Sequence, residues 1–152
     1  MARFVDSIDL PLDPEAAFAL IADFSRLPEW DPGAREARRL DSGPLRAGSR
    51  FEVQYGFLGR RLPLRYEIWS FEPPHRVVLH GGSDVVRSTD EIHFAPREGG
   101  TRVTYEARLE PTGLGALADP LLQLAFPWIG RAAVRGLRAR AAALAKESRH
   151  AA

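Results

Sequence analysis

Residues 34 to 110 alternate between apolar and polar side chains, and this alternation constrains the fold more than any other feature of the sequence. A period of two is typical of strands that have one covered face and one solvated face. Turn signals divide the stretch into five or six strands; they are Ser42-Gly43-Pro44, Leu58-Gly59, Pro73-Pro74, Gly81–Asp84 and Glu98-Gly99-Gly100. Because each connection is short, consecutive strands are expected to pair as antiparallel hairpins.

Centring the strands on four of these turns predicts the register of each hairpin. The predicted pairs are Val53 with Leu64, Tyr55 with Leu62, Ile68 with Leu79, Ser70 with Val77, Leu79 with Val86, Val77 with Ser88, Ile92 with Tyr105 and Asp90 with Ala107. All four registers place the apolar side chains on the same face. A slip of one residue would move a strand's apolar set to the opposite face, so this agreement predicts one continuous apolar surface.

Short elements precede this sheet. Residues 3–10 alternate enough to form another strand. Asp13 and Pro14 then have the pattern of an N-cap followed by Pro at the first helical position, which predicts a helix to about Phe24. We expect Ser25 to cap a second short helical turn through Trp30, ended by residues 31–33.

A long helix is predicted at the C-terminal end, from Asp119-Pro120 to about Glu147, with a kink at Pro127. Its apolar side comprises Leu122, Phe126, Ile129, Ala133, Leu137 and Leu144. Nearly thirty residues span about 40 Å at ~1.5 Å per residue, and only a strongly curved sheet could wrap a helix of that length. The predicted fold is therefore α+β: a curved antiparallel sheet of six or seven strands around the long helix.

Composition narrows the classes of function. The 152 residues suit one domain spanning residues 1–152. A net charge of +1 gives no broad field for nucleic acid. Without cysteines there is no disulfide or thiolate site, and we expect neither a metal nor a cofactor. No apolar signal segment or membrane-spanning stretch is present, so the expected location is cytoplasmic, as a monomer or homodimer.

The order of elements and several local motifs resemble one superfamily. The motifs are Leu27–Gly33, the Phe71–Arg76 turn, Asp90–Pro96 and Gly99–Tyr105. Together they resemble the START-like helix-grip superfamily (SRPBCC), in particular its polyketide cyclase/dehydrase and lipid-transport branch. The resemblance implies a cavity between the long helix and the sheet that holds a lipid, sterol, polyketide or plant hormone. It also implies a choice of functions, since some such proteins are carriers or sensors and a minority are cyclases or dehydratases. No catalytic set of a cyclase matches this sequence.

Asp90 is the most informative polar residue, because its register places it on the apolar face. A carboxylate there is costly unless it is paired or hydrated. It is either a ligand anchor or general base, or a structural salt link at a solvated strand end. Tyr55, Tyr66 and Tyr105 are predicted to face inwards with Ser88, where their hydroxyls either bond to backbone or orient a ligand.

Other polar residues have simpler interpretations. His75 faces Asp90 in the predicted register, although an exposed turn histidine is favoured over an acid-base pair. His80 and His93 lie too far apart for a metal site, at roughly 3.3 Å per residue along the strands. Arg140 is expected to pair with a carboxylate of the two short helices, such as Asp23, or alternatively to bind an acidic head group.

The leading hypothesis is a carrier or sensor that binds a small hydrophobic ligand. The predicted ligand-binding residues are Trp30, Tyr55, Phe57, Tyr66, Leu79, Ser88, Asp90, Tyr105, Leu122, Phe126 and Ile129. The alternative is a polyketide cyclase, aromatase or dehydratase that uses an acid-base residue in the same cavity, with Asp90, Tyr66 and Tyr105 as candidates. A filled core without a cavity would instead indicate an interaction protein.

Overall fold

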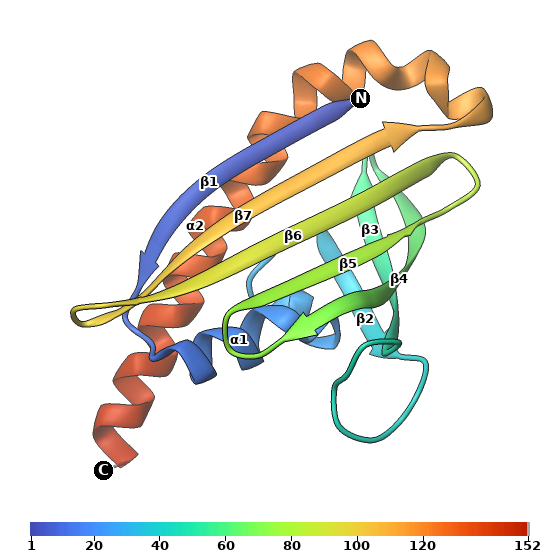
Figure 1. Ribbon diagram of the computed structural model, residues 1–152. Helices are drawn as coiled ribbons and strands as arrows, with labels where there is room; N and C mark the ends of the chain where they lie inside the picture. Colours follow the sequence, from blue (N-terminus) through green and yellow to red (C-terminus); the bar gives the residue numbers. More distant parts are fainter. Residues whose placement is uncertain (152) are drawn as a thin grey trace.

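The computed structural model describes residues 1–151, which form a seven-stranded antiparallel sheet, two α-helices and two short 3₁₀ helices (Figure 1). The strands are β1 (Ala2–Leu10), β2 (Ala34–Arg39), β3 (Arg50–Phe57), β4 (Arg60–Glu72), β5 (Arg76–Gly82), β6 (Val86–Arg97) and β7 (Gly100–Pro111). The helices are α1 (Pro14–Ala22), η1 (Phe24–Glu29), η2 (Gly113–Ala118) and α2 (Asp119–Ala151). The strand order is β1-β7-β6-β5-β4-β3-β2. The predicted α+β helix-grip architecture is confirmed.

Two of the four predicted hairpin registers are confirmed in full. In the β3–β4 hairpin, Val53 pairs with Leu64, and in the β6–β7 hairpin, Asp90 pairs with Ala107. The side chains assigned to the inner face are buried or half-buried, as the alternation predicts. Figure 1 shows the sheet bending, with β2, β3 and β4 crossing the direction of β1, β7 and β6.

The β5–β6 register was predicted wrongly by four residues. Leu79 pairs with Asp90 rather than with Val86, and Val77 pairs with Ile92 rather than with Ser88. Gly81 and Gly82 continue β5 instead of forming the turn, which therefore lies at residues 83–85. Since four is an even number, every side chain keeps the face that was predicted for it.

A bulge shifts the register between β4 and β5. Ile68 pairs with Leu79 as predicted, but Ser70 pairs with Val78 rather than with Val77. Trp69 is the extra residue on the bulged strand, which is the arrangement that a β-bulge produces. Its ring is exposed on the outer face and stacks on His80 with 3.9 Å between the ring centroids.

Aspartates begin both short helices before β2. The Asp13 Oδ1 atom accepts a hydrogen bond from the Ala16 N–H at 2.8 Å, so the predicted N-cap of α1 is confirmed. The next helix is capped by Asp23, which accepts from the Ser25 N–H at 3.0 Å, rather than by Ser25 itself. Ser25 was the expected cap, but Asp23 has the extended backbone of a cap residue and an oxygen that reaches forward.

The long helix α2 continues to Ala151, past the predicted end at Glu147. Pro127 lies within it, and Figure 1 shows the helix axis changing direction in its first half. Close approaches are made at Gly130 and Gly136. A Cβ atom at Gly136 would lie 1.9 Å from the Trp30 carbonyl oxygen, and one at Gly130 would lie 2.6 Å from the Phe4 ring. Glycine therefore lets α2 pack directly on β1 and on the segment after η1.

The hydrophobic core fills the space between the inner face of the sheet, α1, η1 and the second half of α2. Phe24, Phe51 and Leu137 are among its fully buried side chains. Thr101 is also fully buried, and its hydroxyl donates to the Leu12 carbonyl at 2.8 Å. No helix within residues 1–151 is both long and apolar enough to span a membrane.

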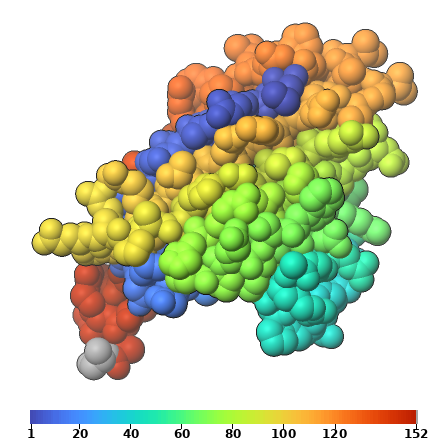
Figure 2. Space-filling model, viewed as in Figure 1, coloured from blue at the N-terminus to red at the C-terminus, as the bar shows by residue number. Residues whose placement is uncertain are grey.

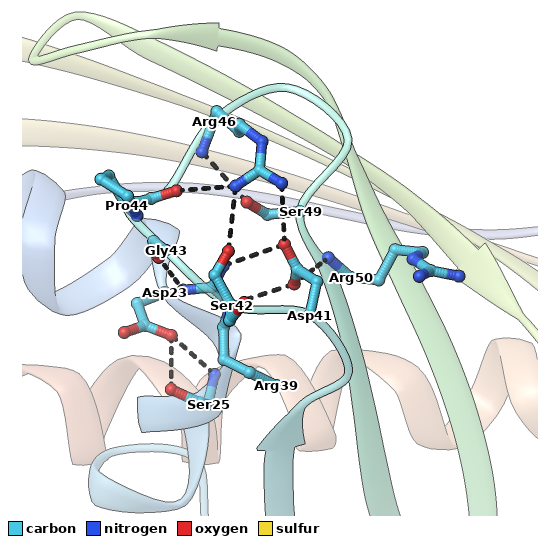
Figure 3. Close-up of polar contacts among 10 residues, drawn as sticks. All are labelled: Asp23, Ser25, Arg39, Asp41, Ser42, Gly43, Pro44, Arg46, Ser49 and Arg50. Carbon is cyan, nitrogen blue, oxygen red and sulfur yellow. Dashed lines mark hydrogen bonds and ion pairs between the residues drawn. The ribbon is translucent and has the colours of Figure 1, made fainter.

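An ion-pair cluster fixes the segment between β2 and β3, which projects as the cyan lobe of Figure 2. Asp41 accepts hydrogen bonds from the Arg39 guanidinium and, at 3.0 Å, from the Arg50 N–H, and Arg46 lies 3.6 Å from the same carboxylate (Figure 3). These donors lower the pKa of Asp41 to about 2, with the Arg39 hydrogen bond as the largest cause. The cluster therefore has a structural role away from the cavity described below.

Candidate ligand cavity

A cavity of about 260 Å³ lies between the sheet and the first half of α2. Its walls come from β1, β3, β4, β6 and β7, from η1 and the residues after it, and from α2. Most of the lining is apolar, and the volume is close to that of small-molecule sites in proteins. The long helix thus covers the concave face of the sheet without filling the space beneath it.

Ten of the eleven residues predicted to bind a ligand lie on the cavity wall. They are Trp30, Tyr55, Phe57, Tyr66, Ser88, Asp90, Tyr105, Leu122, Phe126 and Ile129. Leu79 does not line the cavity, because it is fully buried within the hydrophobic core. Contact of the ten residues with a ligand stays a prediction.

Asp90 is the centre of a hydrogen-bonded network inside the cavity. Ser88 Oγ donates to its Oδ1 at 3.0 Å, Tyr105 Oη donates to its Oδ2, and Tyr66 Oη donates to Ser88 Oγ at 3.2 Å. Burial raises the pKa of Asp90 to about 6, although the two hydrogen bonds favour the ionised form. Burial also raises the pKa of Tyr105, and the nearby Asp90 charge raises it further.

Asp31 is a second buried carboxyl group, in a segment whose sequence predicted only a turn. Its Oδ1 accepts from the Gly33 N–H at 2.9 Å, and Tyr55 Oη lies 3.4 Å from each carboxylate oxygen. Burial raises the pKa of Asp31 to about 6, and repulsion by the Asp90 charge contributes to the same shift. Asp-Pro-Gly is an ordinary turn sequence, so nothing local marked this residue.

Asp6 is a third carboxyl group on the cavity wall. The alternation of apolar and polar residues in β1 is the signal that would have placed it on the inner face. It pairs with Tyr105 across the β1–β7 ladder and shares the inner face with Phe4 and Ile8.

Trp30 completes the polar end of the cavity. It is 5% exposed, its ring packs edge-on against Tyr105, and its Nε1 atom has no hydrogen-bond partner within residues 1–151.

The structure decides between the alternatives for two polar residues. His75 is exposed in the β4–β5 turn, which was the favoured interpretation, and its carbonyl accepts from the Phe94 N–H. It does not face Asp90, because the β5–β6 register differs by four residues from the predicted one. Arg140 pairs with a carboxylate of the short helices, as expected, although the partner is Glu29 of η1 at 3.1 Å rather than Asp23. Among the residues that the structure describes, no three His, Cys, Asp or Glu side chains are grouped as metal ligands.

A family model described as "Polyketide cyclase / dehydrase and lipid transport" matches residues 1–142. The chain belongs to this polyketide cyclase/dehydrase and lipid transport family. The predicted resemblance is thereby confirmed. The match includes every residue of the cavity wall, from Phe4 on β1 to Leu137 on α2.

Relatives of this family member span most of its length. The Mycobacterium tuberculosis protein named Toxin Rv0910 is 30% identical over 122 residues, which cover 80% of this chain and 83% of the relative. The structure of TTHA0849 from Thermus thermophilus has a TM-score of 0.76 and 21% identity, covering 93% of this chain and 98% of the other. The di-domain ARO/CYC StfQ from the steffimycin biosynthetic pathway has a TM-score of 0.71 and 16% identity, covering 95% of this chain and 52% of StfQ. Both structures share the fold of this polyketide cyclase/dehydrase family member.

Proposed function

We propose that this protein binds a small hydrophobic molecule in the cavity between the sheet and α2, as a carrier or sensor. The observation that carries the proposal is the cavity itself, which remains open beside a core whose side chains are buried. Protein interiors otherwise leave few voids larger than a water molecule. An apolar space of this size with a few polar groups at one end is the usual form of a ligand site.

Burial of apolar surface supplies most of the affinity in this proposal, at roughly 25 cal/mol per Å². Phe126, Ile129 and Leu137 form an apolar wall on α2, opposite side chains of the sheet. Asp90 and the tyrosine hydroxyls lie together, so they orient the polar end of the ligand. The family description, which names both lipid transport and polyketide chemistry, supports a ligand of this class.

Native mass spectrometry of the purified protein tests the proposal by detecting a co-purified apolar molecule or an added one. Ala133 lies on the cavity wall, whereas Ala139 is exposed on the same helix. The A133F variant should lose the ligand because its ring occupies the cavity, and the matched A139F variant should retain it. Equal uptake by both variants, or no uptake by the wild type, contradicts binding in this cavity.

A catalytic role is the second candidate, because the buried Asp90 carboxylate accepts a hydrogen bond from the half-buried Tyr105 hydroxyl on the cavity wall. A carboxyl group with a pKa of about 6 is suited to proton transfer near neutral pH. The structural relative StfQ, a di-domain ARO/CYC, shares this fold. The D90N variant separates the two roles: a carrier keeps a neutral ligand, whereas turnover of a polyketide substrate by an enzyme falls sharply.

A further inference from the structure

The polar end of the cavity is unusual in its charge, because it carries carboxyl groups without a basic partner. Asp6, Asp31 and Asp90 line the cavity, and no Lys, Arg or His does so among the residues that the structure describes. None of the three forms an ion pair within residues 1–151. Basic side chains are plentiful elsewhere, since the chain has 21 Lys and Arg residues.

Buried carboxylates without a counter-charge are costly, so a protein either protonates them or supplies a cation. Asp31 is 8% exposed and Asp90 is 7% exposed. Burial raises the pKa of Asp31, and repulsion by the Asp90 charge raises it further. A cationic group of a ligand in this part of the cavity would lower both penalties, because its charge offsets the two carboxylates and it can donate a charge-assisted hydrogen bond.

Aromatic rings surround the same space. Trp30, Tyr55 and Tyr105 all line the cavity, and the Trp30 ring packs edge-on against Tyr105 with 6.2 Å between centroids. The faces of such rings attract ammonium groups, most strongly where water is excluded. Carboxylates together with aromatic rings favour an amine over an alcohol, and an alcohol over a carboxylate.

A second observation indicates what else the ligand carries. The buried Trp30 Nε1 has no hydrogen-bond partner within residues 1–151, although its ring forms part of the cavity wall. A buried donor without an acceptor is unfavourable, because it has lost its hydrogen bond to water and gained none in exchange. An oxygen acceptor on the ligand, such as an ether or a carbonyl, would satisfy it.

We propose that the cavity takes a hydrophobic amine that also carries an oxygen acceptor, with the amine at Asp31 and Asp90 and the acceptor at Trp30. This inference rests on the proposed ligand-binding function and adds the chemical class of the ligand. It excludes carboxylic acids of the same skeleton, because their charge would meet three aspartates and no cation.

The charge preference depends on pH through the groups that face Asp31 and Asp90. These are Asp6 on β1, Tyr55 on β3, Tyr66 on β4 and Tyr105 on β7. The α2 wall has no ionisable side chain; its members are Leu122, Phe126, Ile129, Gly130, Ala133, Val134 and Leu137. The tyrosines remain neutral below pH 10, since burial raises their pKa values further. Protonation of Asp31 and Asp90 therefore controls the pH dependence of the preference for an amine.

Isothermal titration calorimetry with a matched set of probes tests this. The set is 2-(2-naphthyloxy)ethylamine, 2-(2-naphthyloxy)ethanol, 2-naphthyloxyacetic acid and 3-(2-naphthyl)propylamine, which lacks the ether oxygen. At about pH 8 the ether amine should bind about tenfold or more tightly than the alcohol, the gain of one charge-assisted hydrogen bond. The acid should bind more weakly than the alcohol. The amine advantage should shrink as the pH falls from 8 to 5, because burial raises the pKa values of Asp31 and Asp90 to about 6 and protonation removes their charge.

Two variants test which residues produce the preferences for the amine and for the ether oxygen. D31N/D90N should bind the amine and the alcohol equally, with alcohol affinity within about threefold of wild type. W30F should remove the advantage of the ether amine over 3-(2-naphthyl)propylamine. The pH series on wild type does not depend on whether these variants fold. An amine that binds no tighter than the alcohol at pH 8 overturns this inference and leaves the proposed function standing. Failure of every probe overturns the inference, and native mass spectrometry then decides the proposed function separately.

Discussion

Replacing Asp90 by Asn should change how the stability of the protein depends on pH. Burial raises the pKa of Asp90 from 3.8 to about 6 in the folded state, and unfolding restores its ordinary value. Between these values the folded protein keeps a proton that the unfolded chain has released. The free energy of unfolding therefore falls as pH rises through this window, by at most about 1.4 kcal/mol per pH unit.

The magnitude follows from the size of the shift. A difference of about two pH units corresponds to about 3 kcal/mol of stability, present below pH 4 and lost above pH 6. Asn does not titrate, so the D90N variant lacks this loss. Its stability relative to wild type should rise by up to about 3 kcal/mol between pH 4 and pH 7. The substitution also alters the hydrogen bonds to Ser88 and Tyr105, which shifts the free energy of unfolding by a nearly constant amount at every pH.

Urea denaturation followed by tryptophan fluorescence at several pH values measures this difference, provided that unfolding is two-state. The matched control is D84N, which replaces an exposed aspartate in the β5–β6 turn and should follow the wild-type pH profile. Parallel stability curves for wild type and D90N would refute the reasoning, because Asp90 would then titrate alike in both states.

Three further predictions concern single contacts. Y105F removes the hydroxyl that favours ionised Asp90, so carboxyl NMR titration should show the pKa of Asp90 rising above about 6. G136A would normally favour a helix by about 1 kcal/mol, but its Cβ would lie 1.9 Å from the Trp30 carbonyl oxygen. It should therefore lower the melting temperature, whereas A142G at an exposed site of α2 costs only about 1 kcal/mol. D13A loses the 2.8 Å cap at Ala16, and should cost about 1 kcal/mol in urea denaturation.

The fold could be predicted from the sequence because the alternation of side chains and the turn residues agree with each other. A shift of four residues in one hairpin left the inner face intact, since only an odd shift exchanges the faces. The facing of His75 and Asp90 in the predicted register is absent from the structure, because a contact between two particular residues requires the true register and not only the correct face. The bulge at Trp69 depends on tertiary packing and left no local signal.

The candidate site was predictable where it lies on regular strands. Asp90 and Tyr105 were found because alternation places them on an otherwise apolar face. Asp31 was not, since it lies in an irregular segment whose Asp-Pro-Gly sequence occurs in ordinary turns. Its burial arises when η1 and α2 meet, with Gly136 against the Trp30 backbone, and no pattern within either segment indicates that meeting.

The pairing of β1 with β7 and the packing of α2 on β1 have a consequence for synthesis on the ribosome. β1 is made before its partner strand and its covering helix, so the inner-face residues Phe4 and Asp6 stay uncovered until β7 and α2 have been made. Contacts of such high sequence separation slow folding. The cavity therefore cannot form on a nascent chain until α2 has left the exit tunnel, and a ligand of the proposed kind could enter only after that.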